Sequence, residues 1–405
     1  MGRKKKEENV TINQEQELIK GVTYDPEPLE SDVDESELKN LEDSFYDPEK
    51  TQVDLEGLAS ISKDVKKSMA NVSDDQIRII IDSYYQTQKN RIGLENQIRA
   101  VKQGFDQTIN DKNLAIDWLA ADYRNRENQI KKMIDEYVKS NPVCKWASSI
   151  MGIGPIFAAN LYSYIDMDIC KHANQFLNYA GLNDNNIPWL GREKGAAIVN
   201  EAYTKFGLKA SDKITDDVLM YVAEKSGRKF ETVLRGFNSH KAKLNSQKEG
   251  DIAKDKSDKA ILSAYLAKPP YNTDLKTMCY LIGHSFVIVS KNEKSLYGRI
   301  YRERKAFETM QNEKLAYKDQ AARILTEKNL NKNTPTYKCL IEGKLSPAHI
   351  NQRAQRYATK IFLTHFFEAC WIDKYHTAPP VIYPIAFQDH VDYIEPEVPY
   401  SDFIN

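Results

Sequence analysis

The feature that most constrains this 405-residue chain is a long apolar repeat in its first half. From Ile77 to Tyr137, apolar or semi-polar side chains recur at steps of three and four. That spacing places them along one side of an α-helix, as in a coiled coil. Ser73-Asp-Asp-Gln76 predicts the helix start, because serine caps a helix and acids suit its first turn. We expect a coiled-coil arm over 73–141, either as one long helix or, with a break at 110–113, as a helical hairpin.

A second constraint is the segment Met151-Gly-Ile-Gly-Pro155, which lies between two apolar stretches. Two glycines around one apolar residue permit a sharp reversal, because glycine adopts positive φ without a Cβ clash. Pro155 fits the first turn of a following helix, where its missing N–H is not needed. This layout predicts a helix-hairpin-helix, whose unpaired N–H groups form a cradle for a phosphate. The alternative is a tight turn between two packed core helices.

The charge of the chain is unevenly distributed. Residues 1–75 hold 10 Lys and Arg against 20 Asp and Glu, whereas the remaining residues hold 47 against 38. The head over 1–72 is acidic and poor in apolar residues, so we expect it to be largely disordered. The basic body suits a polyanionic partner, and a merely solvated surface is the alternative.

The composition also bears on the cellular compartment in which such a protein is expected. No apolar run approaches the roughly 20 residues needed to span a bilayer, and no apolar segment follows the basic tip at Met1. The five cysteines stand alone rather than in Cys-x-x-Cys pairs, which favours a reducing cytoplasm over a structural zinc site. We therefore expect a cytoplasmic protein with no membrane partner and no metal site.

Several segments together resemble one known domain. The Gly-Ile-Gly-Pro hairpin is followed by an Ile165-Asp-Met-Asp turn, a Phe176-Leu-Asn-Tyr-Ala-Gly-Leu helix end and Gly191-Arg192. A later segment, 272–287, runs from Asn-Thr-Asp-Leu-Lys into an apolar helix. In this order they resemble the C-terminal domain of the insertion-sequence "one-ten" transposases, the bridge-RNA-guided recombinases. In that family a coiled coil also precedes the domain.

This resemblance implies further parts that the chain lacks. Family members open with an RNase-H-like nuclease domain whose four acids bind divalent metal, but residues 1–75 contain no alternating apolar run that builds a sheet. Members also carry a serine nucleophile after the Tyr-Ala-Gly-Leu helix, and the turn over 183–189 contains no serine. The serines that remain as candidates are Ser211, Ser226, Ser257, Ser285, Ser290 and Ser295. The catalytic residues therefore stay unknown, and we identify no cofactor except Mg²⁺ in the case of an active recombinase.

Two basic helices and an extended end are predicted in the last third. The segment 295–305 carries Arg299, Arg302 and Lys305, and a helix beginning at Ser346-Pro347 carries Arg353, Arg356 and Lys360 at steps of three and four. Each row either follows phosphates or is a solvated face. His349, His365 and His376 lack ligand spacing for a metal. Beyond Pro379-Pro380 the chain is extended and aromatic, and we expect it to pack as a C-terminal strap.

We conclude from the sequence that the protein is mainly α. We expect a disordered head (1–72), the arm (73–141), a helix-hairpin-helix domain (142–292) with a helical insertion at about 200–268, and a basic helical extension (293–405). The insertion contains a lysine-rich stretch, which is either a mobile basic loop or an exposed charged helix.

The leading hypothesis is a transposase-family nucleic-acid-binding protein of a mobile element or phage, which binds DNA, or guide RNA plus DNA. The alternatives are an active recombinase completed by a second chain, and a coiled-coil assembly protein. A homo-oligomer through the arm is expected. The residues expected to contact nucleic acid are Lys145, Gly152, Ile153, Gly154, Arg192, Lys194, Arg299, Arg302, Lys305, Arg353, Arg356 and Lys360.

Overall fold

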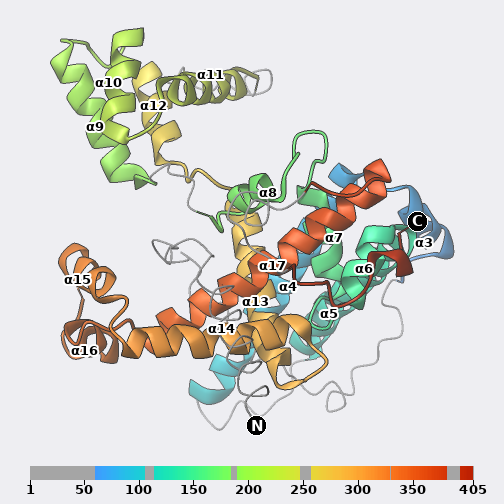
Figure 1. Cartoon of the computed structure of the whole chain (residues 1–405). Helices are drawn as coiled ribbons and strands as arrows, with labels where there is room; N and C mark the ends of the chain where they lie inside the picture. The colour runs from blue at the N-terminus through green and yellow to red at the C-terminus, as the bar shows by residue number, and fades with distance from the viewer. Residues whose placement is uncertain are drawn as a thin grey trace, which may run out of the picture. The chain divides into compact units, whose positions relative to one another are not determined.

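The computed structural model describes residues 60–104, 114–183, 189–246, 257–328, 330–380 and 393–404 (Figure 1). Within these ranges the chain forms α-helices and short 3-10 turns and has no β-strand, which confirms the mainly α prediction.

The chain divides into two compact units. Unit 1 comprises Met1–Phe176 together with Thr277–Asn405, and unit 2 comprises Leu177–Lys276. The helices that lie in unit 1 or at its boundary are α3 (Lys63–Ser68), η2 (Met69–Asn71), α4 (Asp74–Gly104), α5 (Leu114–Ser140), α6 (Pro142–Ser149), α7 (Pro155–Tyr164), α8 (Ala173–Tyr179), α13 (Thr273–Ile288), η4 (Val289–Lys291), α14 (Leu296–Glu313), α15 (Lys318–Glu327), α16 (Pro335–Ile341), α17 (Pro347–Tyr375) and η5 (Tyr400–Asp402). Those of unit 2 are α9 (Gly191–Lys205), α10 (Asp216–Ser226), α11 (Phe230–Ser246) and α12 (Asp258–Ala267).

Most of the predicted disordered head, residues 1–59, lies outside the described residues. The end of that segment differs from the prediction, because α3 and η2 are ordered helical turns that pack against α5. Ser62 caps α3 by accepting the Val65 N–H, and the Met69 side chain is buried. A single buried methionine and a cap thus extend the folded region into sequence whose composition is that of a disordered segment.

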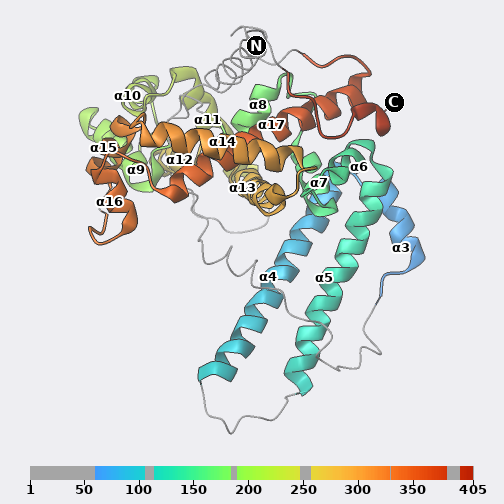
Figure 2. The same cartoon turned by 60° about the horizontal axis from the view of Figure 1, so that its bottom comes forward.

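The arm is the helical hairpin, not one long helix. Helices α4 and α5 lie side by side and run in opposite directions (Figure 2). The break expected at 110–113 falls outside the described residues. At the base of the arm, Ile77, Ile81 and Ile134 are fully buried, so the apolar repeat packs within the chain. The expected homo-oligomer through the arm stays a prediction.

Further along the arm, the facing residues of α4 and α5 are charged. Glu127 accepts hydrogen bonds from Arg91 (Nε–Oε2, 2.5 Å) and Gln88 (Nε2–Oε1, 3.1 Å). Glu95 accepts from Arg91 (Nη1–Oε2, 3.0 Å) and from Arg124 (Nε–Oε1, 2.9 Å). The glutamates and Arg91 keep 10–13% of their side-chain surface exposed and Arg124 keeps 27%. The arm is therefore joined by a half-buried ion-pair network above an apolar base.

The core of unit 1 is aromatic. The rings of Phe286 on α13, Tyr297 on α14 and Phe362 on α17 lie 5.0–5.6 Å apart between centroids, in stacked and edge-on arrangements. Such ring pairs stabilise a core beyond the area they bury. Helices α14 and α17 cross this cluster in opposite directions and continue beyond it, where α15 and α16 pack on their ends around Ala321, Leu340 and Ile350.

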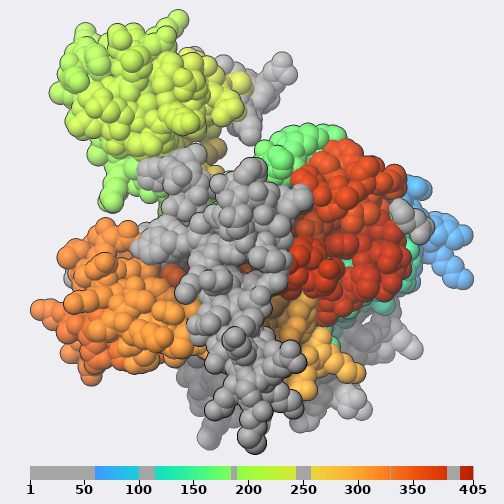
Figure 3. Space-filling view, viewed as in Figure 1, coloured from blue at the N-terminus to red at the C-terminus, as the bar shows by residue number. Residues whose placement is uncertain are grey.

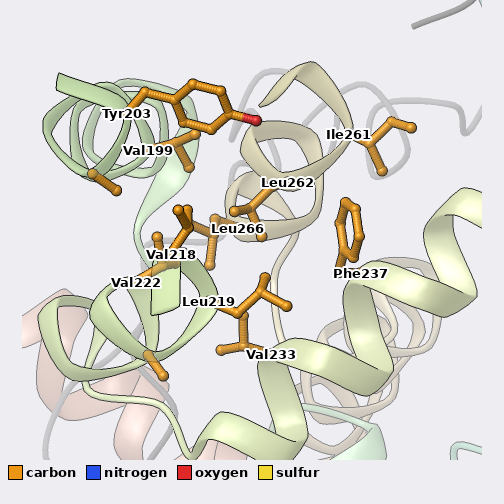
Figure 4. Close-up of a cluster of buried hydrophobic side chains, with 12 residues drawn as sticks. Val199, Tyr203, Val218, Leu219, Val222, Val233, Phe237, Ile261, Leu262 and Leu266 are labelled. Atoms are coloured by element: carbon orange, nitrogen blue, oxygen red, sulfur yellow. The ribbon is translucent and has the colours of Figure 1, made fainter. Parts of the chain in front are cut away.

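Unit 2 has a core of its own. Its helices contribute Val199 and Tyr203 from α9, the α10 side chains Val218 and Val222, and Leu262 from α12, all at most 1% exposed (Figure 4). In the space-filling view the side chains of α9, α10 and α11 form one continuous body (Figure 3).

In unit 2 the start of α9 lies beside the end of α12. The Trp189 Nε1–H donates to the Ala267 carbonyl over 3.0 Å, and Gly195 lies against Leu266. The insertion expected at about 200–268 therefore begins earlier in the structure, because α9 packs Val199 into this core and belongs to the unit.

Candidate nucleic-acid interface

The predicted helix-hairpin-helix is formed by α6, the turn over Ile150–Gly154, and α7. Asn141 caps α6 by accepting the Cys144 N–H over 2.9 Å, and Pro155 occupies the first position of α7. Within the turn, Ile153 N–H donates to the Ile150 carbonyl over 3.0 Å. The Ile153 side chain is 3% exposed, so this predicted contact residue supports the turn from the core and only its backbone can reach a ligand.

Gly152 is the residue that makes the turn possible. Its φ of +94° is a conformation that side-chain-bearing residues rarely adopt. A Cβ there would lie 3.1 Å from Ser285 Oγ and 3.3 Å from Val289 Cγ2. The Gly152 carbonyl also accepts the Ser285 hydroxyl over 2.5 Å, which fastens the turn to α13. Gly152 is therefore required both by its backbone angle and by the close approach of α13.

Gly154 has the opposite environment. Its φ of −87° and ψ of 171° are extended values open to any residue, and nothing lies within 4 Å of a Cβ built on it. The sequence offered both glycines for the sharp reversal, but of the two only Gly152 has a positive φ, so a side chain at Gly154 does not strain the turn. Gly154 itself is exposed and faces open space.

Three N–H groups stand at this open end of the hairpin. Within the described part of the chain, no acceptor is recorded for the amides of Gly154, Ile156 and Phe157. The first N–H groups of a helix have no partner within it and carry the positive end of its dipole. Beside the exposed Gly154 they can donate to an anion that approaches from solvent.

The amide on the other side of the turn is already occupied. Met151 N–H donates to Glu397 Oε1 over 2.8 Å, and the second oxygen of the same carboxylate accepts Leu296 N–H over 2.8 Å. Leu296 is the first residue of α14. One carboxylate thus joins the hairpin to the start of α14, which places the turn and this basic helix next to each other.

The basic residues predicted on α14 are exposed. Arg299, Arg302 and Lys305 lie on the solvent side, whereas Ile300, Tyr301 and Arg304 are buried on the other. Lys305 Nζ donates to the Tyr301 hydroxyl over 3.1 Å. Lys145 on α6 is also exposed. These four cations remain candidates for contact with an anionic ligand.

The row predicted on α17 is different, and its first member needs correction. Arg353 is 7% exposed; its Nε donates to Glu308 Oε2 over 2.8 Å, and its guanidinium stacks on Tyr317. Arg353 is therefore an internal ion-pair partner and does not lie on a surface that binds phosphates. Helical spacing alone cannot separate a solvated arginine from a buried, neutralised one. Arg356 and Lys360 are half-buried and make contacts of their own.

The remaining two predicted residues belong to unit 2. Arg192 and Lys194 lie in the first turn of α9 and are exposed. They form a separate basic pair on that unit.

Most of the candidate serines have structural partners. Ser285 donates to the Gly152 carbonyl, and Ser226 donates to the Ala223 carbonyl within α10. Ser290 in η4 donates to the Val287 carbonyl of α13. The hydroxyls of Ser257 and Ser295 cap α12 and α14. Ser211 is exposed in the loop before α10. Five of the six candidate hydroxyls therefore make structural hydrogen bonds that account for them without a catalytic role.

His365 and Cys279 also lie inside the fold. His365 lies between Tyr297 Oη (2.8 Å from Nδ1) and the Ile394 carbonyl (2.8 Å from Nε2), and burial lowers its pKa to about 4. A neutral ring that donates from Nε2 and accepts at Nδ1 satisfies both partners. Burial also raises the pKa of the Cys279 thiol. Among the described residues, no group of three or more His, Cys, Asp or Glu side chains is placed to hold a metal ion.

Sequence reasoning missed Glu397 and considered Ser285 only as a candidate nucleophile, whereas both residues hold the hairpin in place. The Glu-Pro-Glu-Val-Pro run over 395–399 was the available signal, because prolines in a polar tail favour an extended segment that can pack on another surface.

The expected C-terminal strap is confirmed for residues 393–404. Trp146 Nε1–H on α6 donates to the Val398 carbonyl over 2.8 Å, and the Tyr400 ring packs on Trp146 at 5.2 Å between centroids. Figure 1 shows this end of the chain in dark red beside α6.

Comparison with family models, with curated proteins and with solved structures found no match to this chain. In the ranges that the structure describes, no helix has both the length and the apolar character needed to cross a bilayer.

Proposed function

We propose that this protein binds nucleic acid through the sugar–phosphate backbone, with the open end of the hairpin on one phosphate and the exposed cations of α14 on others. The observation that carries the proposal is the pairing of two features at one place. The N–H groups at Gly154, Ile156 and Phe157 have no recorded acceptor in the described chain, and Glu397 ties the same turn to the start of α14.

Such a surface contacts backbone and not bases, so it fixes position on a duplex and carries no sequence code. The resemblance of the hairpin region to the "one-ten" transposases supports a role with the DNA, or the guide RNA plus DNA, of a mobile element. Lys145 and the pair Arg192 and Lys194 are proposed as further backbone contacts.

Affinity for duplex DNA, branched DNA and structured RNA across a salt series tests this proposal. Gly154→Val is the decisive variant, because its extended backbone and open surroundings accept a side chain without strain. We expect a small loss of thermal stability, because Gly154 is the N-cap of α7 and valine is a poorer N-cap than glycine. Affinity should fall by about tenfold, since the side chain blocks the approach of a phosphate to the amides. Unchanged affinity in the folded variant would remove the hairpin from the interface.

The charges of α14 are tested by Arg299→Gln combined with Arg302→Gln. If both contact duplex phosphates, the slope of log affinity against log salt should flatten by nearly two units. Lys338→Gln on α16 is the matched control, because it removes one positive charge from an exposed site outside the proposed surface. An equal effect per charge in this control would indicate attraction by net charge and not a defined contact.

The same assays separate the two alternatives. Strand cleavage or exchange that needs Mg²⁺ and a second polypeptide would favour a recombinase completed by another chain. A stable oligomer that binds neither DNA nor RNA at low salt would favour an assembly protein.

A further inference from the structure

The C-terminal strap places a negative charge at the hairpin. The Glu397 carboxylate accepts one N–H from the hairpin turn at Met151 and one from the first residue of α14 at Leu296, each over 2.8 Å. Two convergent backbone N–H groups at a turn and a helix start are the kind of donors that bind phosphate. In this conformation of the chain, a side chain of the chain itself occupies them.

The segment around Leu296, whose N–H Glu397 accepts, is rich in basic residues. Lys291 and Lys294 precede Leu296 and Arg299 follows it, and all three are exposed. Glu293 is the one acid within the run 291–299. This excess of positive charge along the segment would attract the phosphates of a nucleic acid.

The strap is attached mainly by polar contacts at a few points. His365 Nε2–H donates to the Ile394 carbonyl, Trp146 donates to Val398, and the Tyr400 hydroxyl donates to Glu368 Oε2 over 2.6 Å. Tyr393 donates to the same Glu368 oxygen. Within residues 393–404, Ile404 is the apolar side chain that becomes fully buried. A segment held by these hydrogen bonds, by Ile404 and by the packing of Tyr400 on Trp146 opens at lower cost than the core helices.

We propose that the strap is an intramolecular competitor of the nucleic acid, with Glu397 standing where a backbone phosphate binds. This inference rests on the proposed function. Displacement of residues 393–404 frees the amides of Met151 and Leu296, removes a negative charge beside the Gly154 cradle, and extends the anion site from the hairpin to α14. The chain thus has a closed form of low affinity and an open form of high affinity, and the ligand binds the open form selectively.

Glu397→Gln in the full chain is the first test, with Glu395→Gln as the matched control. Both variants remove one negative charge from the strap, but only position 397 contacts the two amides, and Glu395 is exposed. A glutamine offers one acceptor oxygen for the two N–H donors and sets its own NH₂ against the other. We expect Glu397→Gln to bind duplex DNA about tenfold more tightly than the wild type at low salt and Glu395→Gln to change affinity by less than about twofold.

A second variant loosens the strap without changing its charge. Tyr400→Phe keeps the ring on Trp146 and removes the hydroxyl that donates to Glu368. We expect a smaller gain in affinity of about threefold, because the closed form loses one hydrogen bond. Thermal unfolding of each variant confirms that the protein remains folded.

Hydrogen exchange separates a competitor from a purely structural clamp, because DNA binding would not increase exchange in a strap that serves only as a clamp. Saturating duplex DNA should increase exchange over residues 393–404 in the wild type. Unchanged or slower exchange there would overturn the proposal. So would a folded Glu397→Gln variant that binds no more tightly than the wild type, or a Glu395→Gln control that gains as much.

The two proposals fail in different ways. If the wild type binds and its affinity depends on Gly154, but the strap variants behave like the wild type, only the strap proposal is overturned. If neither the wild type nor Glu397→Gln binds duplex DNA, branched DNA or structured RNA at low salt, the proposed function and the strap proposal both fall.

Discussion

Two antiparallel helix pairs in unit 1 both contain ion pairs at the helix interface, but these ion pairs are buried to different degrees. The arm pairs α4 with α5, and the second pair is α14 with α17. Each places glutamate between arginines across the helix interface. In the arm, Glu127 and Glu95 keep contact with water. In the second pair, Glu308 is 1% exposed between Arg304 and Arg353.

The difference in depth changes what the charges do. Burial would raise the pKa of the Glu308 carboxyl, but Arg304 and Arg353 hold it below its usual value. Tyr317 donates a further hydrogen bond to it, and Arg304 also stacks on Tyr357. A fully buried charge must be neutralised by its neighbours, whereas the arm glutamates, with 10–13% of the side-chain surface exposed, are also partly solvated by water. We therefore expect the same residue types to constrain the helix packing more strongly in the second pair than in the arm.

The largest expected effect is at Glu308. Glu308→Ala leaves Arg304 and Arg353 facing each other without a counter-charge, and we expect a loss of about 3–5 kcal/mol in the free energy of unfolding. Glu313→Ala on the same helix is the control, because the Glu313 pair with Lys344 is exposed and should contribute less than about 1 kcal/mol. Denaturant unfolding measures both. Equal losses of unfolding free energy in Glu308→Ala and Glu313→Ala would show that burial does not distinguish the two ion pairs.

The second prediction concerns pH and His365, which lies on α17, whereas the arm contains no histidine. The unfolded imidazole has a pKa of about 6.5 and the folded one about 4, so between these values only the unfolded chain binds the proton. Stability should therefore fall as the pH drops from 6.5 to 4, by about 3 kcal/mol from this group, and should not depend on it above pH 7.

Comparison of the wild type with His365→Gln isolates this effect, because glutamine can still donate to Ile394 and does not titrate. The unfolding free energy of the wild type minus that of His365→Gln should fall steadily as the pH drops from 6.5 to 4. His349, whose pKa burial and Arg353 also lower to about 4, contributes equally to both proteins and cancels. A difference that stays constant with pH would contradict the neutral, buried state of His365.

The smallest expected effect is in the arm. Glu127→Ala removes the acceptor shared by Gln88 and Arg91, and we expect a loss of about 1–2 kcal/mol, between the values for exposed and buried pairs. A double-mutant cycle with Arg91→Ala isolates the coupling between the two side chains. High salt should reduce this coupling more than that of Glu308 with Arg353. A loss as large as that at Glu308 would remove the distinction between the two pairs.

Local signals in the sequence were sufficient for the helices and their ends. Ser73 and Gln76 cap α4 reciprocally, and Ser346 with Pro347 begins α17 as predicted. The Gly-Ile-Gly-Pro run predicted the turn between α6 and α7. These succeed because capping, positive φ and apolar spacing depend on neighbours within a few residues.

The candidate site was predicted less completely. Exposure of Arg299, Arg302 and Lys305 follows from the apolar face of α14, which the sequence shows. The burial of Arg353 does not, because it depends on Glu308 from α14 and on Tyr317 from the turn before α15. The assignment of the tight turn to Gly152 instead of Gly154 also depends on α13 packing against the hairpin.

The sequence by itself therefore determined that this protein is helical, where its arm begins, where its hairpin turns, and that its end forms a strap. Those properties depend on short-range rules of backbone conformation and apolar period. Only the tertiary structure decided which arginine is buried, which serine holds the turn and that Glu397 occupies two amides at the hairpin. Each of these is a contact between segments far apart in the chain, and the free energy of such a contact depends on burial and on partners that no local pattern specifies.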